Sequence, residues 1–428
     1  MFKRLLFVTS LLVVASMLLA ACGSAATPTT APAVEAPTSA PAVAATEAPA
    51  QATAPAAYEC KDAIGCAVIK PGETIKIGMG APMTGDNAQF GVDISQGQKI
   101  AVSDAGDLNG FKFELVAEDD GGTAEGGAAV ANKFVSDPTV VAIAGHIFSG
   151  ATGAAIPIYE KAGLPMMSPS ATNPALTASG SKVFNRVVFT DAAQGKFAAT
   201  YMFNTLKVTK IAVLHDGSTY GQGLAQVTND EFTKLGGEVL AFQAITPGES
   251  DYSSILASLA SKNPEVLYFG GYVAEAVVLV NQMKAAGLTN TIFFGDDGTY
   301  GQDFLDRTAA NGEGSYSTSL IPASTPAKDK FDAAYLAAYQ TPPGKLSPYT
   351  WTAYDSAAVL IAAVKSVAVL GGDGNLYIPR QALIDAVRGT KDYQGLSGLI
   401  SCDAVGECSS SGPTFYVDKG GKWEAAAK

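Results

Sequence analysis

Histidine is scarce in this chain, whose 428 residues contain only His146 and His215. Two lone histidines are too few for a convincing zinc site. His215, Asp216 and the nearby Ser218 are residue types that a hydrolase could use, but the G-x-S-x-G elbow that presents a nucleophilic serine is missing. We therefore predict that the chain is not an enzyme and has no catalytic residues, metal or cofactor, and that a strand-end histidine is structural.

Motifs for phosphate and calcium binding are missing as well. The sequence G-x-x-x-x-G-K-[ST] does not occur, so any ATP hydrolysis belongs to a partner. The segment 119–122, DDGG, lacks the spaced oxygen ligands and the closing glutamate of a calcium loop. We interpret it as the end of a strand.

Positive charge is in short supply, because 28 Lys and Arg stand against 40 Asp and Glu, a net charge of −12. Such a balance opposes long-range attraction to nucleic acid or to an anionic bilayer. No segment beyond the N-terminal region has the length and apolarity of a membrane span.

The N-terminal residues have the pattern of a lipoprotein signal. Lys3 and Arg4 precede an apolar run over 5–21, and small residues lead directly to Cys22. The run is short for a membrane span, which needs about 20 apolar residues. We predict a signal peptide over 1–21 and lipidation of Cys22, which would hold the protein on the outer face of the cytoplasmic membrane. An uncleaved transmembrane anchor is the alternative.

Residues 23–57 consist largely of Ala, Pro and Thr, with two Glu and no aromatic residue. Such a composition cannot bury enough apolar surface to offset the entropy of ordering, and repeated proline favours extended conformations. We predict that 22–57 is the lipidated cysteine followed by a disordered tether. A low-complexity tail without a role is the alternative.

The remaining four cysteines form two short pairs, Cys60/Cys66 and Cys402/Cys408. Even pairing in an exported chain argues for disulfides. Three connectivities are possible, and the spacing favours the two local loops. A four-thiolate zinc site is the rival, but its cysteine pairs usually lie closer together in sequence.

The body from residue 58 onward is too long for one ordinary core and alternates strand and helix patterns. This alternation predicts an α/β fold of two doubly wound parallel-sheet lobes joined by a hinge. A break at 189–191 suggests 58–190 with 321–411 as lobe 1, and 191–320 with 412–428 as lobe 2. The expected strands are 74–78, 111–117, 140–144, 165–168, 183–188, 211–215, 238–242, 266–269 and 292–295. The expected helices include 124–135, 192–206, 224–235, 252–260, 274–286 and 328–339.

Polar and aromatic side chains follow the expected strands of both runs. Ser149 and the loop 168–172 follow strands of the first run, while Tyr220, Tyr272 and Asp297 follow strands of the second. Ligands of open α/β sheets lie at the carboxyl ends of strands, and hydroxyls with free N–H groups at a helix start suit a carboxylate. Each residue also has an ordinary alternative, as a helix cap, a turn residue or a packing aromatic.

Several segments resemble one known family. They are PMTGDNAQFG, VAEDDGG, GHIFSGAT, MMSPSATNPALT, LHDGSTYGQGLA, ITPGESDYSSIL, LYFGGYVAEA and SPYTWTAYDSA, in this order. Together they resemble the leucine/isoleucine/valine-binding proteins of bacterial ABC importers, which are type 1 periplasmic binding proteins. The resemblance extends from Ile75 to about Trp423.

The resemblance implies a ligand site for an α-amino acid. Ser149 would bind the carboxylate, and the loop of Ser170, Ala171 and Thr172 would hold the carboxylate and ammonium groups. Asp297 would pair with the ammonium. Two tyrosines would cover the ligand and two phenylalanines would wall its side chain, namely Tyr220, Tyr272, Phe90 and Phe148.

The chain departs from the family pattern at three places. The family often has Glu where Asp297 stands and Tyr where Phe90 stands. It often has a disulfide where this chain has Gly121-Gly122 and Phe148. These departures leave the choice of side chain open, and Asp296 is an alternative partner for the ammonium.

From these observations we expect an extracytoplasmic solute-binding lipoprotein that captures a small amino acid, most of all a branched-chain one. Its partners would be an ABC permease and ATPase, its membrane contact the N-terminal lipid alone, and its state a monomer that binds no nucleic acid. The alternatives are a sensory receptor on the same fold, or a binding protein for another amino acid, an amide or a urea-like solute.

Overall fold

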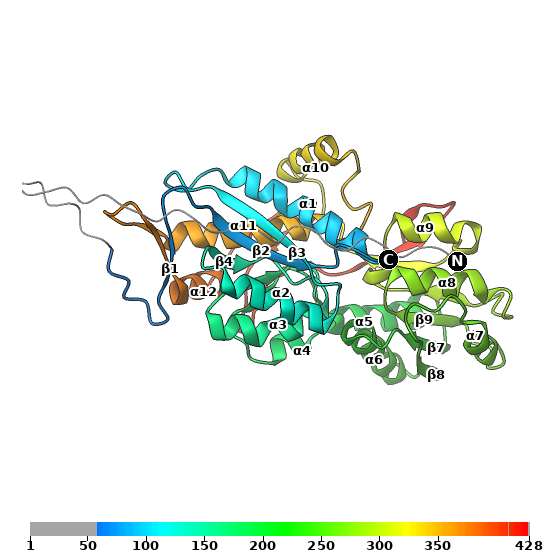
Figure 1. Cartoon of the computed structure of the whole chain (residues 1–428). Helices are drawn as coiled ribbons and strands as arrows, with labels where there is room; N and C mark the ends of the chain where they lie inside the picture. Colours follow the sequence, from blue (N-terminus) through cyan, green and yellow to red (C-terminus); the bar gives the residue numbers. More distant parts are fainter. Residues whose placement is uncertain (1–57, 410, 427–428) are drawn as a thin grey trace, which may run out of the picture. The chain divides into compact units, whose positions relative to one another are not determined.

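The computed structural model describes residues 58–409 and 411–426, so the predicted signal peptide, the lipidated Cys22 and the tether lie outside it. Two mainly parallel sheets form the framework (Figure 1). Together they confirm the predicted α/β class with doubly wound parallel sheets. The exact lobe boundaries stay a prediction.

The first sheet has the order β3-β2-β4-β5-β6, with every neighbouring pair parallel. Its strands are β2 (Ile75–Ala81), β3 (Phe113–Asp119), β4 (Val140–Ile143), β5 (Met166–Ser168) and β6 (Phe184–Arg186). All four residues of β4 are buried, as expected for a central strand covered on both faces.

The second sheet has the order β8-β7-β9-β10-β11 and is extended by two antiparallel strands, β16 and β17. Its strands are β7 (Lys210–His215), β8 (Glu238–Ala244), β9 (Val266–Gly270), β10 (Ile292–Phe294), β11 (Tyr316–Ser319), β16 (Thr414–Asp418) and β17 (Trp423–Ala425). The chain therefore returns to this sheet near its C-terminal end. Small antiparallel sheets are formed by β1 (Cys66–Ile69), β13 (Leu376–Pro379) and β12 (Val369–Leu370), and by β14 (Tyr393–Gln394) and β15 (Leu399–Ile400).

Helices cover both faces of each sheet. On the first sheet, α1 (Ala88–Ala105) and α11 (Thr350–Val367) share one core cluster, while α2 (Ala124–Ser136) and α3 (Ser149–Ala162) share another. On the second, α5 (Asp191–Thr200) and α6 (Thr219–Lys234) cover one face, and α7 (Ser253–Ala260), α8 (Val273–Met283) and α9 (Gln302–Thr308) cover the other. The remaining helices are α4 (Ala175–Ala178), α10 (Pro326–Tyr339) and α12 (Arg380–Arg388), and α5 continues into a π-helical turn, Tyr201–Thr205.

The predicted strands match observed ones within a few residues, whereas the helices named from the sequence do not include α1, α3, α4, α9, α11 and α12. Of these, α1 and α11 pack closely against each other. A Cβ on Gly97 of α1 would lie 2.7 Å from the carbonyl oxygen of Thr350 in α11. Glycine permits this approach, but two glycines, Gly91 and Gly97, also interrupt the apolar pattern by which a helix is found in a sequence.

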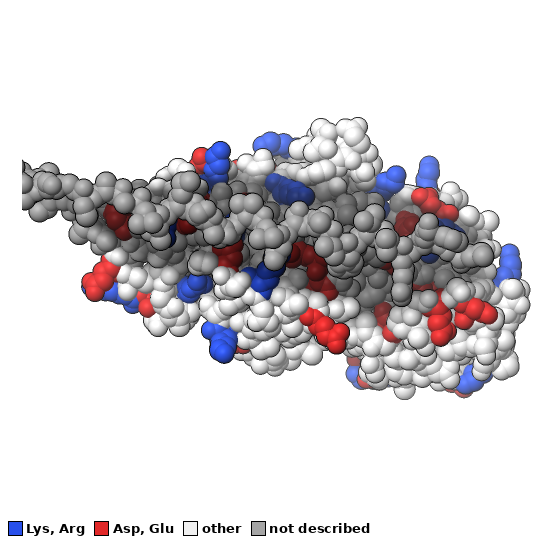
Figure 2. All heavy atoms as spheres, viewed as in Figure 1, with Lys and Arg blue, Asp and Glu red and all other residues white. Residues whose placement is uncertain are grey.

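Both predicted disulfides, Cys60–Cys66 and Cys402–Cys408, are confirmed. Among the described residues, no helix has the length and apolarity needed to cross a membrane. On the face seen in Figure 2, acidic and basic side chains are interspersed and do not separate into patches of one sign.

A buried carboxylate joins three helical segments of the first lobe. Asp93 of α1 accepts hydrogen bonds from Tyr335 of α10 (2.6 Å), Ser347 (2.5 Å) and Thr350 of α11 (2.8 Å). Complete burial nevertheless raises its pKa to about 6. Burial raises the pKa of Asp355 and Asp216 to about 6 in the same way.

These raised pKa values predict that the body is more stable in mild acid. The unfolded chain ionises these aspartates near pH 4 and the folded chain near pH 6, so their contribution to the free energy of unfolding is lost as the pH rises through about 6. We expect the melting temperature to be at least about 2 °C higher at pH 5 than at pH 7.5. Asp93→Asn should reduce this difference and the control Asp107→Asn, at an exposed loop position, should not. A melting temperature that falls from pH 7.5 to pH 5 would contradict the prediction.

Candidate functional site

In both sheets, the first strand of the chain segment lies between the second and the third strand. The order in which strands are added to the sheet therefore changes direction beside this first strand. Ligands of open α/β sheets bind outside the carboxyl ends of the strands at this point. Phe90 and Ser149 follow β2 and β4, which flank the reversal in the first sheet. Tyr220 and Tyr272 follow β7 and β9, which flank it in the second.

A small cavity lies where these residues meet. It contains six of the predicted site residues, and its lining is Phe90, Ile147, Phe148, Ser149, Ser170, Tyr220, Tyr272, Gly298 and Tyr349. Its volume of about 10 Å³ leaves room for a single water-sized sphere. Two larger surface hollows, of about 480 and 780 Å³, contain none of the predicted site residues.

Aromatic rings from both lobes fill the site. The rings of Phe148 and Tyr272 are stacked, with centroids 4.2 Å apart and planes 12° apart, and Phe90 lies edge-on to both. Gly122 makes room for Phe148, because a Cβ there would lie 2.8 Å from its ring. An amino acid therefore fits only if Phe148 and Tyr272 separate.

Ser149 lies in the first turn of α3, and the cap position before it is occupied by Phe148 without a side-chain cap bond. The Ser149 hydroxyl oxygen instead accepts a hydrogen bond from the N–H of Asn173 at 3.3 Å. The structure thus does not use Ser149 as an ordinary helix cap. Ser149 lines the cavity at the start of α3, where the first N–H groups of the helix have no partner within it.

The predicted loop 170–172 is largely engaged within the protein. The Ser170 hydroxyl donates to the carbonyl of Ile147 at 2.8 Å. Ala171 donates its N–H to Ser168 Oγ at 3.0 Å, and its carbonyl accepts from Arg186 at 2.9 Å. Within the described part of the chain, the hydroxyl of Thr172 is buried without a hydrogen-bond partner. The Thr172 hydroxyl nevertheless lies close to Asp191, because it opposes the rise in the pKa of that carboxyl.

Asp297 is fully buried and binds groups from both lobes. Its carboxylate accepts hydrogen bonds from the hydroxyls of Tyr220 and Tyr349 and from the Gln194 side chain at 2.7 Å. Tyr349 directly precedes α11 on the first lobe, whereas Tyr220 and Gln194 belong to helices of the second. Burial raises the pKa of Asp297, although these three donors oppose the rise.

Two more buried carboxylates lie beside Asp297. Asp191, the first residue of α5, has both carboxylate oxygens buried without a partner among the described residues. Burial and the charge of Asp297 raise its pKa well above the ordinary value, and the Thr172 hydroxyl, the Arg186 guanidinium and the Gln194 side chain oppose the rise. Asp296 accepts from the Gly271 N–H at 2.9 Å through one oxygen, and its other oxygen is buried without a partner in the described chain. Such a group of acids stabilises a cation that enters among them.

Sequence reasoning missed Asp191, Gln194 and Tyr349. For Asp191 a signal existed, since Thr190 caps α5 and the acid follows in its first turn, but we used the segment only as a domain break. Tyr349 lies inside one of the segments that resemble the binding-protein family, without a distinctive local pattern. Gln194 comes close to Asp297 only through the tertiary fold.

The remaining polar candidates have partners inside the protein. The ring nitrogens of buried His146 bind Asp120 (2.7 Å) and Tyr159 (2.8 Å). Asp216 accepts from the Ser218 N–H, and Ser218 caps α6, so this pair builds a helix start. Within the described ranges, no cluster of His, Cys, Asp or Glu could hold a metal ion.

Comparison with known proteins agrees with this geometry. A family model described as periplasmic binding protein matches residues 74–420. Leu/Ile/Val-binding protein homolog 1 of Brucella abortus is 33% identical over 356 residues, which are 82% of this chain and 91% of that protein. An amino acid binding protein of Pseudomonas aeruginosa is 39% identical over 227 residues, 52% of this chain, and the match spans only 60% of that protein.

The fold is also shared with solved structures. The structure of a leucine binding protein from Thermotoga maritima superposes with a TM-score of 0.75 and 28% identity, covering 83% of this chain and 98% of that one. The family match over most of the sequence and the shared two-lobed fold show that this chain belongs to the periplasmic binding protein family, whose members are binding proteins and not enzymes.

Proposed function

We propose that the chain is the solute-binding lipoprotein of an ABC importer and captures a small amino acid, most of all a branched-chain one, between its lobes. The observation that carries this proposal is the convergence of the Ser149 and Thr172 hydroxyls with two buried acids, Asp191 and Asp297. An α-amino acid offers an anion and a cation a few ångströms apart, which matches such a pair of subsites. The relatives named as amino acid and Leu/Ile/Val-binding proteins support the same ligand class.

The carboxylate of the ligand would bind at the start of α3. Ser149 would donate its hydroxyl, and the first N–H groups of this 14-residue helix point toward the same place. The ammonium would bind among Asp297, Asp191 and the Thr172 hydroxyl. Charge-assisted hydrogen bonds of this kind contribute about 1.5–3 kcal/mol each. Asp297 is favoured over Asp296, because Asp296 already holds the Gly271 N–H beneath the site.

The side chain of the ligand would lie against Phe90, Phe148 and Tyr272. Entry of an aliphatic group separates the stacked rings of Phe148 and Tyr272 and replaces their contact. Burial of such a group stabilises the complex by about 1.5–3 kcal/mol. The bulk of Phe148 favours compact side chains, such as those of valine and isoleucine, over long ones.

Binding would be coupled to closure of the lobes over 58–190 with 321–411 and 191–320 with 412–428. A ligand that contacts Ser149 on one lobe and Asp297 on the other stabilises the closed state. Export, the lipid anchor at Cys22, delivery to a permease and ATPase, and a monomeric state complete this proposal.

Calorimetric titration of the body with each of the twenty common amino acids tests the ligand class. We expect at least one aliphatic amino acid to bind with micromolar affinity or better. Ser149→Ala and Asp297→Asn should each weaken that binding at least tenfold, since each removes one charge-assisted contact. The controls are Ser136→Ala and Asp107→Asn, at exposed positions. No binding better than millimolar would refute an amino acid ligand.

Binding should also depend on pH in one direction. Burial raises the pKa of Asp297, and burial together with the charge of Asp297 raises the pKa of Asp191. The groups that face these two acids are Asp296, Arg186, Thr172, Gln194, Tyr220 and Tyr349. A ligand ammonium favours the ionised acids, so binding lowers these pKa values and releases protons. Affinity should therefore fall as the pH drops below the raised values. The number of protons released on binding is measured by calorimetry in buffers of different ionisation enthalpy. Asp191→Asn should reduce this number. Uptake of protons on binding would contradict the assignment.

The Phe148 ring should set the size limit of the ligand. Phe148→Ala removes the ring that stacks on Tyr272 and enlarges the small cavity. We expect the ratio of affinities for phenylalanine over valine to rise at least tenfold, measured by competition against a fluorescent or isotopically labelled ligand. Leu235→Ala, a truncation at a partly exposed helix end, is the control. An unchanged ratio would place the ligand side chain elsewhere.

A further inference from the structure

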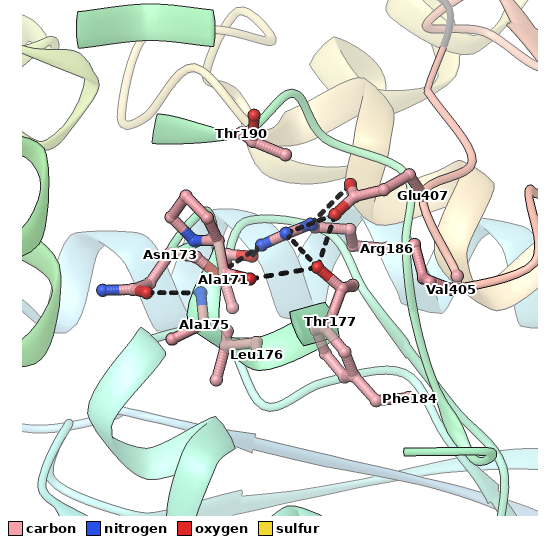
Figure 3. A network of polar contacts seen from close by, with 12 residues as sticks. Ala171, Asn173, Ala175, Leu176, Thr177, Phe184, Arg186, Thr190, Val405 and Glu407 are labelled. Atoms are coloured by element: carbon pink, nitrogen blue, oxygen red, sulfur yellow. Dashed lines mark hydrogen bonds and ion pairs between the residues drawn. The ribbon is translucent and has the colours of Figure 1, made fainter. Parts of the chain in front are cut away.

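Arg186, at the end of β6, is the largest fully buried side chain of the described residues, yet it does not line the cavity. All three guanidinium nitrogens are hydrogen-bonded (Figure 3). Nε and Nη2 bind the two carboxylate oxygens of Glu407 at 2.8 and 2.5 Å, and Nη2 also donates to Thr177 Oγ1 at 3.0 Å. Nη1 donates to two main-chain carbonyls, of Ala171 at 2.9 Å and of Asn173 at 2.8 Å.

These two carbonyls flank Thr172. They belong to the 171–172 and 173–174 peptides, so Arg186 holds the main chain before Thr172 and after Asn173. The 172–173 peptide between them reaches Ser149, since the Asn173 N–H donates to Ser149 Oγ. It also reaches Asp191, whose N–H donates to the Thr172 carbonyl at 3.0 Å. One buried cation thus holds the main chain that connects both proposed subsites.

Glu407, which neutralises Arg186, belongs to the ring closed by the Cys402–Cys408 disulfide. Inside this ring, Asp403 Oδ1 accepts the N–H groups of Val405, Gly406 and Glu407, each at 2.9 Å. These three hydrogen bonds fix the main chain of the ring up to Glu407, and so the position from which the Glu407 side chain extends.

The ring is also attached to the edge of the first sheet. Arg186 donates its N–H to the Gly406 carbonyl at 2.9 Å, and its own carbonyl accepts from Cys408 at 3.0 Å. From α12, Arg388 donates to the carbonyls of Ala404 and Phe184, both at 2.8 Å. The ring 402–408 consequently extends the sheet beyond β6, its edge strand.

We propose that the ring 402–408 and its Glu407 are a positioning device for the ligand loop, acting through Arg186 to fix residues 171–173 and so the hydroxyl of Thr172. This inference rests on the proposed function, because it assigns Thr172 to the ligand. Glu407 touches no residue of the cavity lining except through this chain of contacts. Its side chain is 27% exposed, so the device links a partly solvated acid to an enclosed site.

The physical reason is the cost of an unpaired buried charge. Removing one partner of a buried ion pair leaves the other without compensation. Arg186 would then turn toward other acceptors and release the carbonyls of Ala171 and Asn173. Asp191 is one such acceptor, since the Arg186 charge already opposes the rise in its pKa.

The test is Glu407→Gln, with Glu118→Gln as a matched control. Glu118 forms an ion pair of 2.6 Å with Lys133 on the same lobe, and its side chain is 23% exposed, but it has no contact with the loop. With L-isoleucine as the probe, Glu407→Gln should weaken binding at least fivefold at a temperature where both variants are folded. Glu118→Gln should change it less than twofold.

A double-mutant cycle with Thr172→Val distinguishes an effect of Glu407 through the loop from a merely structural effect on the whole lobe. If Glu407 acts through the loop, its substitution should change affinity less than twofold once the Thr172 hydroxyl is gone. A fivefold loss that persists in the Thr172→Val background would overturn the proposal. The double variant Cys402→Ser/Cys408→Ser should weaken binding in the same direction as Glu407→Gln.

Amide hydrogen exchange tests without a ligand whether Glu407 holds the loop. Glu407→Gln should raise amide exchange at least threefold in peptides that span 168–178, and Glu118→Gln should not. Unchanged exchange there would also overturn the proposal. If the wild type binds no amino acid, the proposed function fails, while the exchange measurement still shows whether the ring holds the loop.

Discussion

The burial of Asp297 is the constraint on which the cleft depends. A carboxylate removed from water must be hydrogen-bonded or must take up a proton. Asp297 finds its donors on both lobes, in the hydroxyls of Tyr220 and Tyr349 and the amide of Gln194. The carboxylate of Asp297 thereby links the two lobes directly beside the small cavity.

This arrangement makes the site electrostatically negative. Asp191, Asp296 and Asp297 are fully buried within one region, and Arg186, the cation near Asp191, is neutralised by Glu407. Hydrogen bonds from tyrosines reduce the cost of burying these acids but do not supply positive charge. A ligand that brings an ammonium group among these acids would offset their negative charge, a ligand without a cationic group would not, and an anionic group there would add repulsion.

The sequence sufficed for the parts of the structure that follow from local pattern. Strand positions follow from short buried apolar runs, and the disulfides from spacing in an exported chain. The placement of Ser149, Tyr220 and Tyr272 at one site follows from the rule that parallel strands present their carboxyl ends on one edge. The resemblance added the pairing of Phe90 and Phe148 with these residues, and both line the cavity.

Other features were beyond sequence reasoning because they depend on residues far apart in the chain. Tyr349 reaches Asp297 from 52 positions away, and Glu407 reaches Arg186 from 221. Neither pair has a local signature. The helix α1 was obscured by the glycines that allow it to touch α11, since the packing that requires Gly97 also erases the apolar period.

The stack of Phe148 on Tyr272 has a consequence for discrimination among solutes. At the proposed site, every solute that enters between these rings would first break a ring contact worth about 0.5–1.5 kcal/mol. The cost is the same for all solutes and lowers every apparent affinity by about 2- to 13-fold. A solute that binds strongly would still occupy the site after this loss of affinity. A solute that binds weakly would no longer occupy it at the same concentration. The aromatic stack would thus reduce the occupancy of the site by abundant, poorly fitting solutes, although no side chain repels them specifically.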